Sequence, residues 1–140
     1  MRVQLCYYAD VGPSIYPRVQ AVDYDLQKGI LDNGVQVYQF DGKDYLTYKN
    51  LNFGPSGTTK IIQLRYSKGS SNGGSVDFKI DGPEGTNVIG QFTPVGTGGW
   101  NKYKTAIINI PDDVVGIQDL TLRGRGAAGI MNFEWFELSA

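Results

Sequence analysis

Residues 60–81 read KIIQLRYSKGSSNGGSVDFKID and carry the clearest structural signal of the chain. Apolar and polar residues alternate in 60–66 and again in 75–81, which is the period of a β-strand with one buried face. The side chains expected on the buried faces are Ile62, Leu64 and Tyr66 in the first strand and Val76, Phe78 and Ile80 in the second. The glycine-rich residues 68–74 between them predict a turn.

Similar alternating runs recur along the chain, and none of its long segments has a helical period. They cover residues 18–24, 44–51, 103–110, 118–124 and 130–138. Clusters of Gly, Pro, Asn and Asp separate them, as in 81–87, 96–99, 111–113 and 124–129. About ten short strands joined by such turns predict an all-β fold, a two-sheet antiparallel β-sandwich of jelly-roll type.

Length and charge narrow the class of protein. The 140 residues predict a single domain over 1–140, in which 1–15 are an extra strand or the remnant of a preceding region. The first residues are too polar for a signal peptide. With 13 basic and 14 acidic residues and no basic run, we expect no nucleic-acid partner. No apolar stretch approaches the roughly 18 residues of a membrane helix, so we expect no membrane partner.

The chain offers little for catalysis. It has no histidine, which excludes Ser-His-Asp triads, Cys-His pairs and histidine-based zinc sites. Cys6 is the only cysteine, so no disulfide can form within the chain. Glu134 and Glu137 could suggest a glycosidase pair, but in a strand they are expected to point to opposite faces. We therefore predict that the protein is not an enzyme.

Trp100 stands in an unusual place, at the end of the loop sequence VGTGGW (95–100). Loop glycines bury little apolar area, so this tryptophan is not part of a core strand. Its flat face and N–H group could stack on a sugar ring, whose axial C–H groups form a matching apolar patch. It could equally fold back and cap the sandwich, and the residues alone leave both interpretations open.

The order of these features resembles carbohydrate-binding module family 6, a group of β-sandwich modules attached to polysaccharide-degrading enzymes. The resemblance extends from Arg18 to Leu138, with its most specific part in IIQLRYSKGSSNGGSVDFKIDGPEGTNVIGQFTPVGTGGWNKYKT (61–105). The other matching pieces are VQAVDYD (19–25), DGKDYLTYKNLNFG (41–54), DLTLRGRG (119–126) and NFEWFEL (132–138).

The resemblance implies a sugar site among the loops at one end of the sandwich, with two aromatic residues and an asparagine. Trp100 and Asn132 match the family's loop tryptophan and its asparagine. In the family, the second aromatic residue stands six positions before a tryptophan that corresponds to Tyr45 here. Six positions before Tyr45 is Gln39, and Tyr38 lies one place earlier. A one-residue shift reverses the face of a strand residue, so either Gln39 forms that wall or a bulge returns Tyr38 to it.

The resemblance also implies a structural calcium ion, but one of its ligands is missing. The family reads QAE where this chain reads QAV, so Val22 replaces the glutamate. Gln20 and Glu137 remain, and a calcium site with so few oxygen ligands is weakened. We therefore count no cofactor as certain. Tyr45, Phe53 and Trp135 are expected to be structural, since each stands at an apolar position of a strand-like run.

These observations predict non-catalytic binding of a β-glycan, with xylan or a β-glucan as the first candidate and an agar-type galactan as another. The resemblance further implies a covalently linked glycoside hydrolase, which the module would target to polysaccharide, and a secreted parent protein. The alternative is a sandwich of a larger toxin or adhesin that docks to a receptor or a neighbouring domain.

Overall fold

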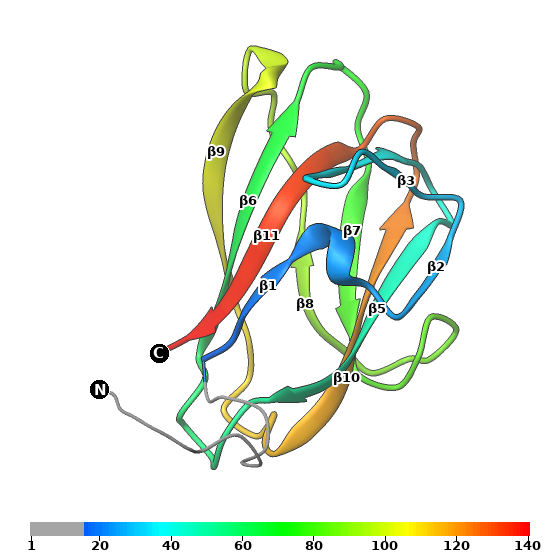
Figure 1. The fold of residues 1–140 in the computed structure, drawn as a ribbon. Helices are drawn as coiled ribbons and strands as arrows, with labels where there is room; N and C mark the ends of the chain where they lie inside the picture. Colours follow the sequence, from blue (N-terminus) through cyan, green and yellow to red (C-terminus); the bar gives the residue numbers. More distant parts are fainter. Residues whose placement is uncertain (1–15) are drawn as a thin grey trace.

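A computed structural model describes residues 16–140 and shows two antiparallel β-sheets packed face to face (Figure 1). The predicted all-β sandwich is therefore confirmed. The possible extra strand in 1–15 and Cys6 lie outside the described residues. Within residues 16–140 no helix has the length and apolar character needed to cross a membrane.

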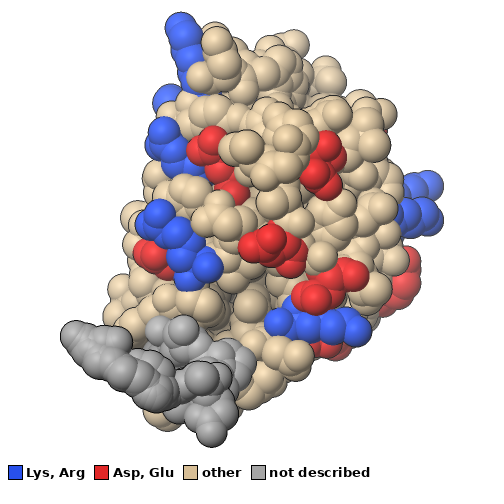
Figure 2. Space-filling model, viewed as in Figure 1, with Lys and Arg blue, Asp and Glu red and all other residues tan. Residues whose placement is uncertain are grey.

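The first sheet has the strand order β3-β4-β11-β6-β9, with β1 paired to β11. Its strands are β1 (Arg18–Gln20), β3 (Leu31–Asp32), β4 (Val37–Phe40), β6 (Ile61–Lys68), β9 (Gly99–Asn109) and β11 (Met131–Ser139). Acidic and basic side chains are interspersed on the side of the molecule that carries β1 and β11, without a patch of one sign (Figure 2).

The second sheet has the order β2-β5-β10-β7-β8. Its strands are β2 (Leu26–Lys28), β5 (Tyr45–Asn52), β7 (Ser75–Lys79), β8 (Val88–Phe92) and β10 (Ile117–Arg125). Strands β6 and β7, which follow one another in the sequence, thus belong to different sheets. The glycine-rich segment 69–74 is the connection that crosses from one layer to the other.

Alternating side chains from the two sheets meet in one core. The predicted inward residues of β6, together with Val76, Phe78, Leu120 and Leu122 of the opposite sheet, are buried. Phe53 is fully buried as expected. Tyr45 was expected in the core, but it is only half-buried, because Leu46 takes the inward position beside it.

A bulge in β11 corrects the predicted faces of its aromatic residues. The register with β6 shifts between Phe133 and Trp135, so Phe133 and Phe136 both enter the core. Trp135 is left on the outer side, where the Arg18 guanidinium lies 3.9 Å from the centre of its ring. The same bulge corrects the expectation that Glu134 and Glu137 face opposite ways. Both carboxylates form ion pairs with arginines of the first sheet, Glu134 with Arg65 and Glu137 with Arg18.

The predicted strand 18–24 ends early. Strand β1 stops at Gln20 and a 3-10 helix, η1, follows over Ala21–Asp23. The buried Tyr48 hydroxyl donates a 2.6 Å hydrogen bond to the Ala21 carbonyl, and its ring packs edge-on against Phe136. Burial raises the pKa of Tyr48 well above its usual value, so the hydroxyl remains a donor. Tyr48 thus joins the N-terminal segment to both sheets.

Tyr48→Phe is expected to lower the free energy of unfolding by about 1–2 kcal/mol, because the Ala21 carbonyl loses its buried donor. The measurement is equilibrium urea denaturation. Tyr24→Phe is the control, since that hydroxyl bonds Asp32 at an exposed site and its removal should change stability by less than about 0.5 kcal/mol. Equal effects of the two substitutions would contradict the role given to Tyr48.

Candidate carbohydrate-binding cleft

A hollow of about 540 Å³ opens at the end of the sandwich where β9 and β11 begin, at the top of Figure 1. Its lining consists of Asn33, Gln36, Tyr38, Gln39, Asp41, Trp100, Gly129 and Asn132. The four residues predicted from the sequence as sugar contacts, Tyr38, Gln39, Trp100 and Asn132, are therefore brought together. We call this hollow the end cleft.

Strand β4 reaches the end cleft through a bulge. Val37 pairs with Phe133 and Phe40 with Met131, so a step of three residues on β4 opposes a step of two on β11. The extra residue lets Val37 and Phe40 both enter the core, and Gln39 adopts a positive φ of 59°. Tyr38 and Gln39 both remain outside the core and line the cleft. The sequence left these two residues as alternatives for one wall of the site, and the bulge places both of them in the lining of the cleft.

Trp100 lies on the rim of the cleft, 38% exposed, against the backbone of Gly69. A Cβ atom added to Gly69 would lie 2.5–2.8 Å from three atoms of the indole five-membered ring, so the ring covers this glycine. The preceding loop is fixed to the end of β6, because Thr97 exchanges hydrogen bonds with Lys68. Ser67 donates to the Trp100 carbonyl at 2.8 Å. The indole is held in place by the chain beneath it and keeps part of its surface open.

Asn132 supplies an unused amide. It is only 9% exposed, yet its side chain makes no hydrogen bond with any residue of 16–140. The side-chain oxygen of Gln36 is also buried without a partner among these residues. A fully buried polar atom without a partner costs about 1–3 kcal/mol, whereas the amide atoms of Asn132 are not fully buried. The Asn132 amide lines the cleft and is therefore available to bond a hydroxyl that enters it.

The opposite rim is pinned by hydrogen bonds. The Asp41 carboxylate accepts from Gly129 N at 2.8 Å, and Ser70 donates to the Gly129 carbonyl at 2.9 Å. The buried Lys68 ammonium donates to the Ile130 carbonyl at 2.9 Å, and burial lowers the pKa of this lysine. These contacts fix segment 129–130 against β6 and so set the width of the cleft.

The rim residues Asn33, Gln36, Asp41 and Gly129 were not predicted from the sequence. The side-chain oxygen of Asn33 accepts from the backbone of Val35 and Gln36, which shapes the turn before β4. The signal that could have located this turn is DNG at 32–34, since Asp, Asn and Gly are turn-forming residues.

The two remaining candidates for calcium binding lie on the β1–β11 pair, where Gln20 pairs with Trp135 and Glu137 with Arg18. The Glu137 carboxylate accepts from Arg18 Nε at 3.1 Å, and that guanidinium places a positive charge where a cation would have to bind. Within residues 16–140 no three Asp, Glu, Cys or His side chains are grouped to hold a metal. With Val22 in place of a carboxylate, the residues present do not fit a calcium ion.

Residues 19–140 match the sequence model of the family described as carbohydrate binding module, family 6. The chain is 30% identical over 105 residues, 75% of its length, to endo-1,4-beta-xylanase A of Thermoclostridium stercorarium. That match spans 19% of the xylanase, so the chain corresponds to about a fifth of this curated relative.

Two solved structures are similar over most of the chain. A family 6 carbohydrate-binding module from Clostridium cellulolyticum, in complex with xylose, has a TM-score of 0.79 and 30% identity over 89% of this chain and 98% of that one. A β-1,3-glucan-binding family 6 module from Bacillus halodurans has a TM-score of 0.79 and 25% identity over 93% and 100%.

Gly69→Ala is expected to displace the Trp100 indole, since the new methyl group would overlap the ring. In a Trp135→Phe background, acrylamide quenching of Trp100 fluorescence should increase. Gly73→Ala is the matched control, because a Cβ at that glycine of the same loop meets no atom within 4 Å. Unchanged quenching in Gly69→Ala would show that Gly69 does not hold the indole.

Proposed function

The chain belongs to family 6 of the carbohydrate-binding modules, and we propose that its end cleft binds a β-glycan without catalysis. The observation that supports this most directly is the lining of the cleft. Two aromatic side chains, Tyr38 and Trp100, and the unpaired amide of Asn132 face the same hollow. Apolar ring faces combined with a few convergent polar groups are what a sugar ring requires.

The aromatic residues account for affinity. The axial C–H groups of a pyranose would stack on the indole of Trp100, and the Tyr38 ring would contact the same sugar or its neighbour. The indole is already held by Gly69 and the 93–99 loop, so little order must be gained on binding. One such site, exposed to water at its rim, gives modest affinity.

The polar residues account for orientation. Asn132 can both donate to and accept from sugar hydroxyls through its amide. Gln39 adds a second amide at the wall formed by β4. Hydroxyls that meet these groups are favoured over those that leave them unpaired.

Xylan and β-glucans are the ligands that we propose first, because the similar solved modules are described with xylose and as β-1,3-glucan-binding. An agar-type galactan is the further candidate. We also propose that the module is linked to an extracellular glycoside hydrolase, as its match to part of a xylanase suggests. Binding would then keep the enzyme near polysaccharide and raise its effective concentration there.

Trp100→Ala is expected to weaken glycan binding at least about tenfold, since the stacking surface is lost while the fold is retained. Affinity electrophoresis in gels with xylan, mixed-linkage β-glucan, laminarin or agarose measures this as lost retardation. Asn132→Ala should weaken binding in the same gel. Trp135→Ala is the matched control, because Trp135 lies on the outer side of the first sheet against Arg18. This variant should bind glycan like the wild type.

Retention of full affinity by Trp100→Ala would place the sugar site elsewhere on the molecule. No retardation of the wild type in any gel would contradict glycan binding. That result would favour a domain that docks to another protein.

A further inference from the structure

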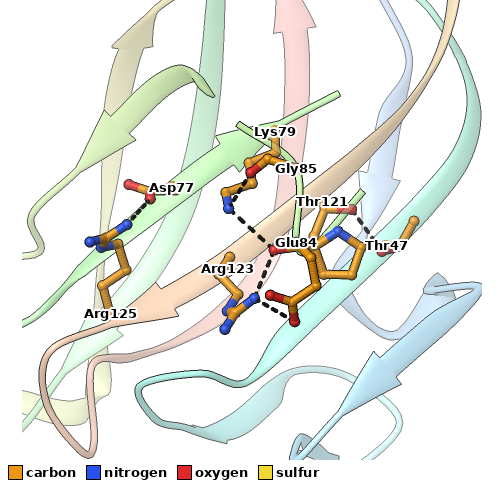
Figure 3. Close-up of polar contacts among 9 residues, drawn as sticks. Thr47, Asp77, Lys79, Glu84, Gly85, Thr121, Arg123 and Arg125 are labelled. Atoms are coloured by element: carbon orange, nitrogen blue, oxygen red, sulfur yellow. Dashed lines mark hydrogen bonds and ion pairs between the residues drawn. The ribbon is translucent and has the colours of Figure 1, made fainter. Parts of the chain in front are cut away.

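The polar face of the second sheet is unexpectedly buried. Asp77 and Lys79 alternate with core residues of β7 and were expected to face solvent, yet they are only 1% and 8% exposed. The loop between β7 and β8 covers Lys79, because it folds back over the outer face of the sheet (Figure 3), whereas Asp77 is covered by Arg125 and Gln91. Asp81 fixes the end of the loop by accepting from the backbone of Thr86 and Asn87.

Cations of the sheet hold this loop chiefly through its backbone. The Lys79 ammonium donates to the carbonyls of Pro83 and Gly85 at 3.2 and 2.9 Å. The Arg123 guanidinium donates to the same Pro83 carbonyl at 2.7 Å and lies 3.1 Å from the carboxylate of Glu84. In Figure 3 both cationic side chains point toward the segment that carries Glu84.

A second hollow of about 370 Å³ lies beside the loop, and its charge is strongly unbalanced. Four cations line it, Lys43, Lys79, Arg123 and Arg125, against one carboxylate, Glu84, while its other lining residues are glycines of 124–126. No aromatic side chain is among the lining residues, in contrast to the end cleft. The chemistry of this hollow is therefore electrostatic.

The carboxylates nearby leave much of this positive charge uncompensated. The buried Asp77 carboxylate is already bonded by Arg125 at 3.0 Å and by the Gln91 amide at 2.7 Å. Lys79 has only carbonyl partners, and Lys43 has no ion-pair partner among residues 16–140. Arg125 uses one terminal nitrogen for Asp77 and keeps its other N–H groups available.

We propose that this basic hollow binds an anionic substituent of a glycan, the carboxylate of a uronic acid or a sulfate ester. The proposal rests on the proposed function of the end cleft and extends it to acidic glycans. One short turn contributes to both hollows, since Asp41 lines the first and Lys43 the second. Glu84, whose side chain is 83% exposed, supplies a carboxylate of the protein's own that an acidic sugar would displace.

Substitutions at two exposed residues test this proposal, and their expected effects on the affinity for an acidic glycan are opposite. Lys43→Gln removes a cation of the hollow and should lower the affinity for glucuronoxylan about two- to fivefold. Glu84→Gln removes the competing carboxylate and should raise the affinity by a similar factor. Neither should alter binding to carboxyl-reduced glucuronoxylan, the uncharged counterpart. Isothermal titration at low salt measures the affinity of the wild type and of both variants for both glycans, and the differences should shrink as salt screens the charges.

Equal affinity of the wild type for glucuronoxylan and its reduced form, with both variants unchanged, would overturn a uronic acid as the substituent. The same titrations with carrageenan against agarose then test a sulfate ester, and equal binding of these two would overturn the proposal altogether. Tighter binding to carrageenan, with Lys43→Gln weaker and Glu84→Gln tighter, would support it with sulfate as the source.

Failure of the proposed function gives a different pattern, because then neither neutral glycan binds and Trp100→Ala changes nothing.

Arg125→Gln, checked by thermal denaturation for folding, should also weaken the binding of acidic glycans selectively. Selective loss in this variant supports the basic hollow, and equal loss for charged and neutral glycans counts against it.

Discussion

Burial of both Val37 and Phe40 is the constraint on which the end cleft depends. A regular strand places residues three apart on opposite faces, so β4 can bury both only with an extra residue between them. Gln39 provides it by adopting a positive φ of 59°. Tyr38 and Gln39 are thereby excluded from the core and directed to the cleft. Burial of two apolar side chains thus fixes the wall of the cleft that carries Tyr38.

The other wall depends on the absence of a side chain. Gly69 allows the Trp100 indole to lie on the backbone at the end of β6, and even a methyl group would overlap it. Lys68, which precedes Gly69, bonds Thr97 of the loop before Trp100 through its backbone. Its ammonium group bonds the 129–130 segment. One end of one strand therefore positions both rims. In the proposed function, this pre-organisation lowers the entropy lost on ligand binding.

The sequence was most informative where alternation is regular, and least where a strand departs from it. The alternation alone placed Ile62, Leu64 and Tyr66 in the core. It could not reveal the bulges beside Gln39 and Trp135, because one extra residue leaves no trace in composition. The end of β1 at Gln20 was missed for a similar reason. A 3-10 helix of three residues is too short to show a helical period. Trp100 and Asn132, which both line the cleft, could be selected because a motif identifies them regardless of register.

Burial of Asp77 and Lys79 could not be predicted either, because their alternation is that of a solvated face. Lys79 is covered by the β7–β8 loop, whose return depends on backbone carbonyls that the sequence does not display, and Asp77 is covered by Arg125 and Gln91. Removing a lysine from water is costly, and hydrogen bonds to carbonyls only partly compensate for it. Apolar residues could cover this face at lower cost, as they do in the core. Lys79 and Arg123 hold the loop and Arg125 pairs with Asp77, so these cations have structural partners. The proposed anion would compensate the positive charge that those contacts leave over.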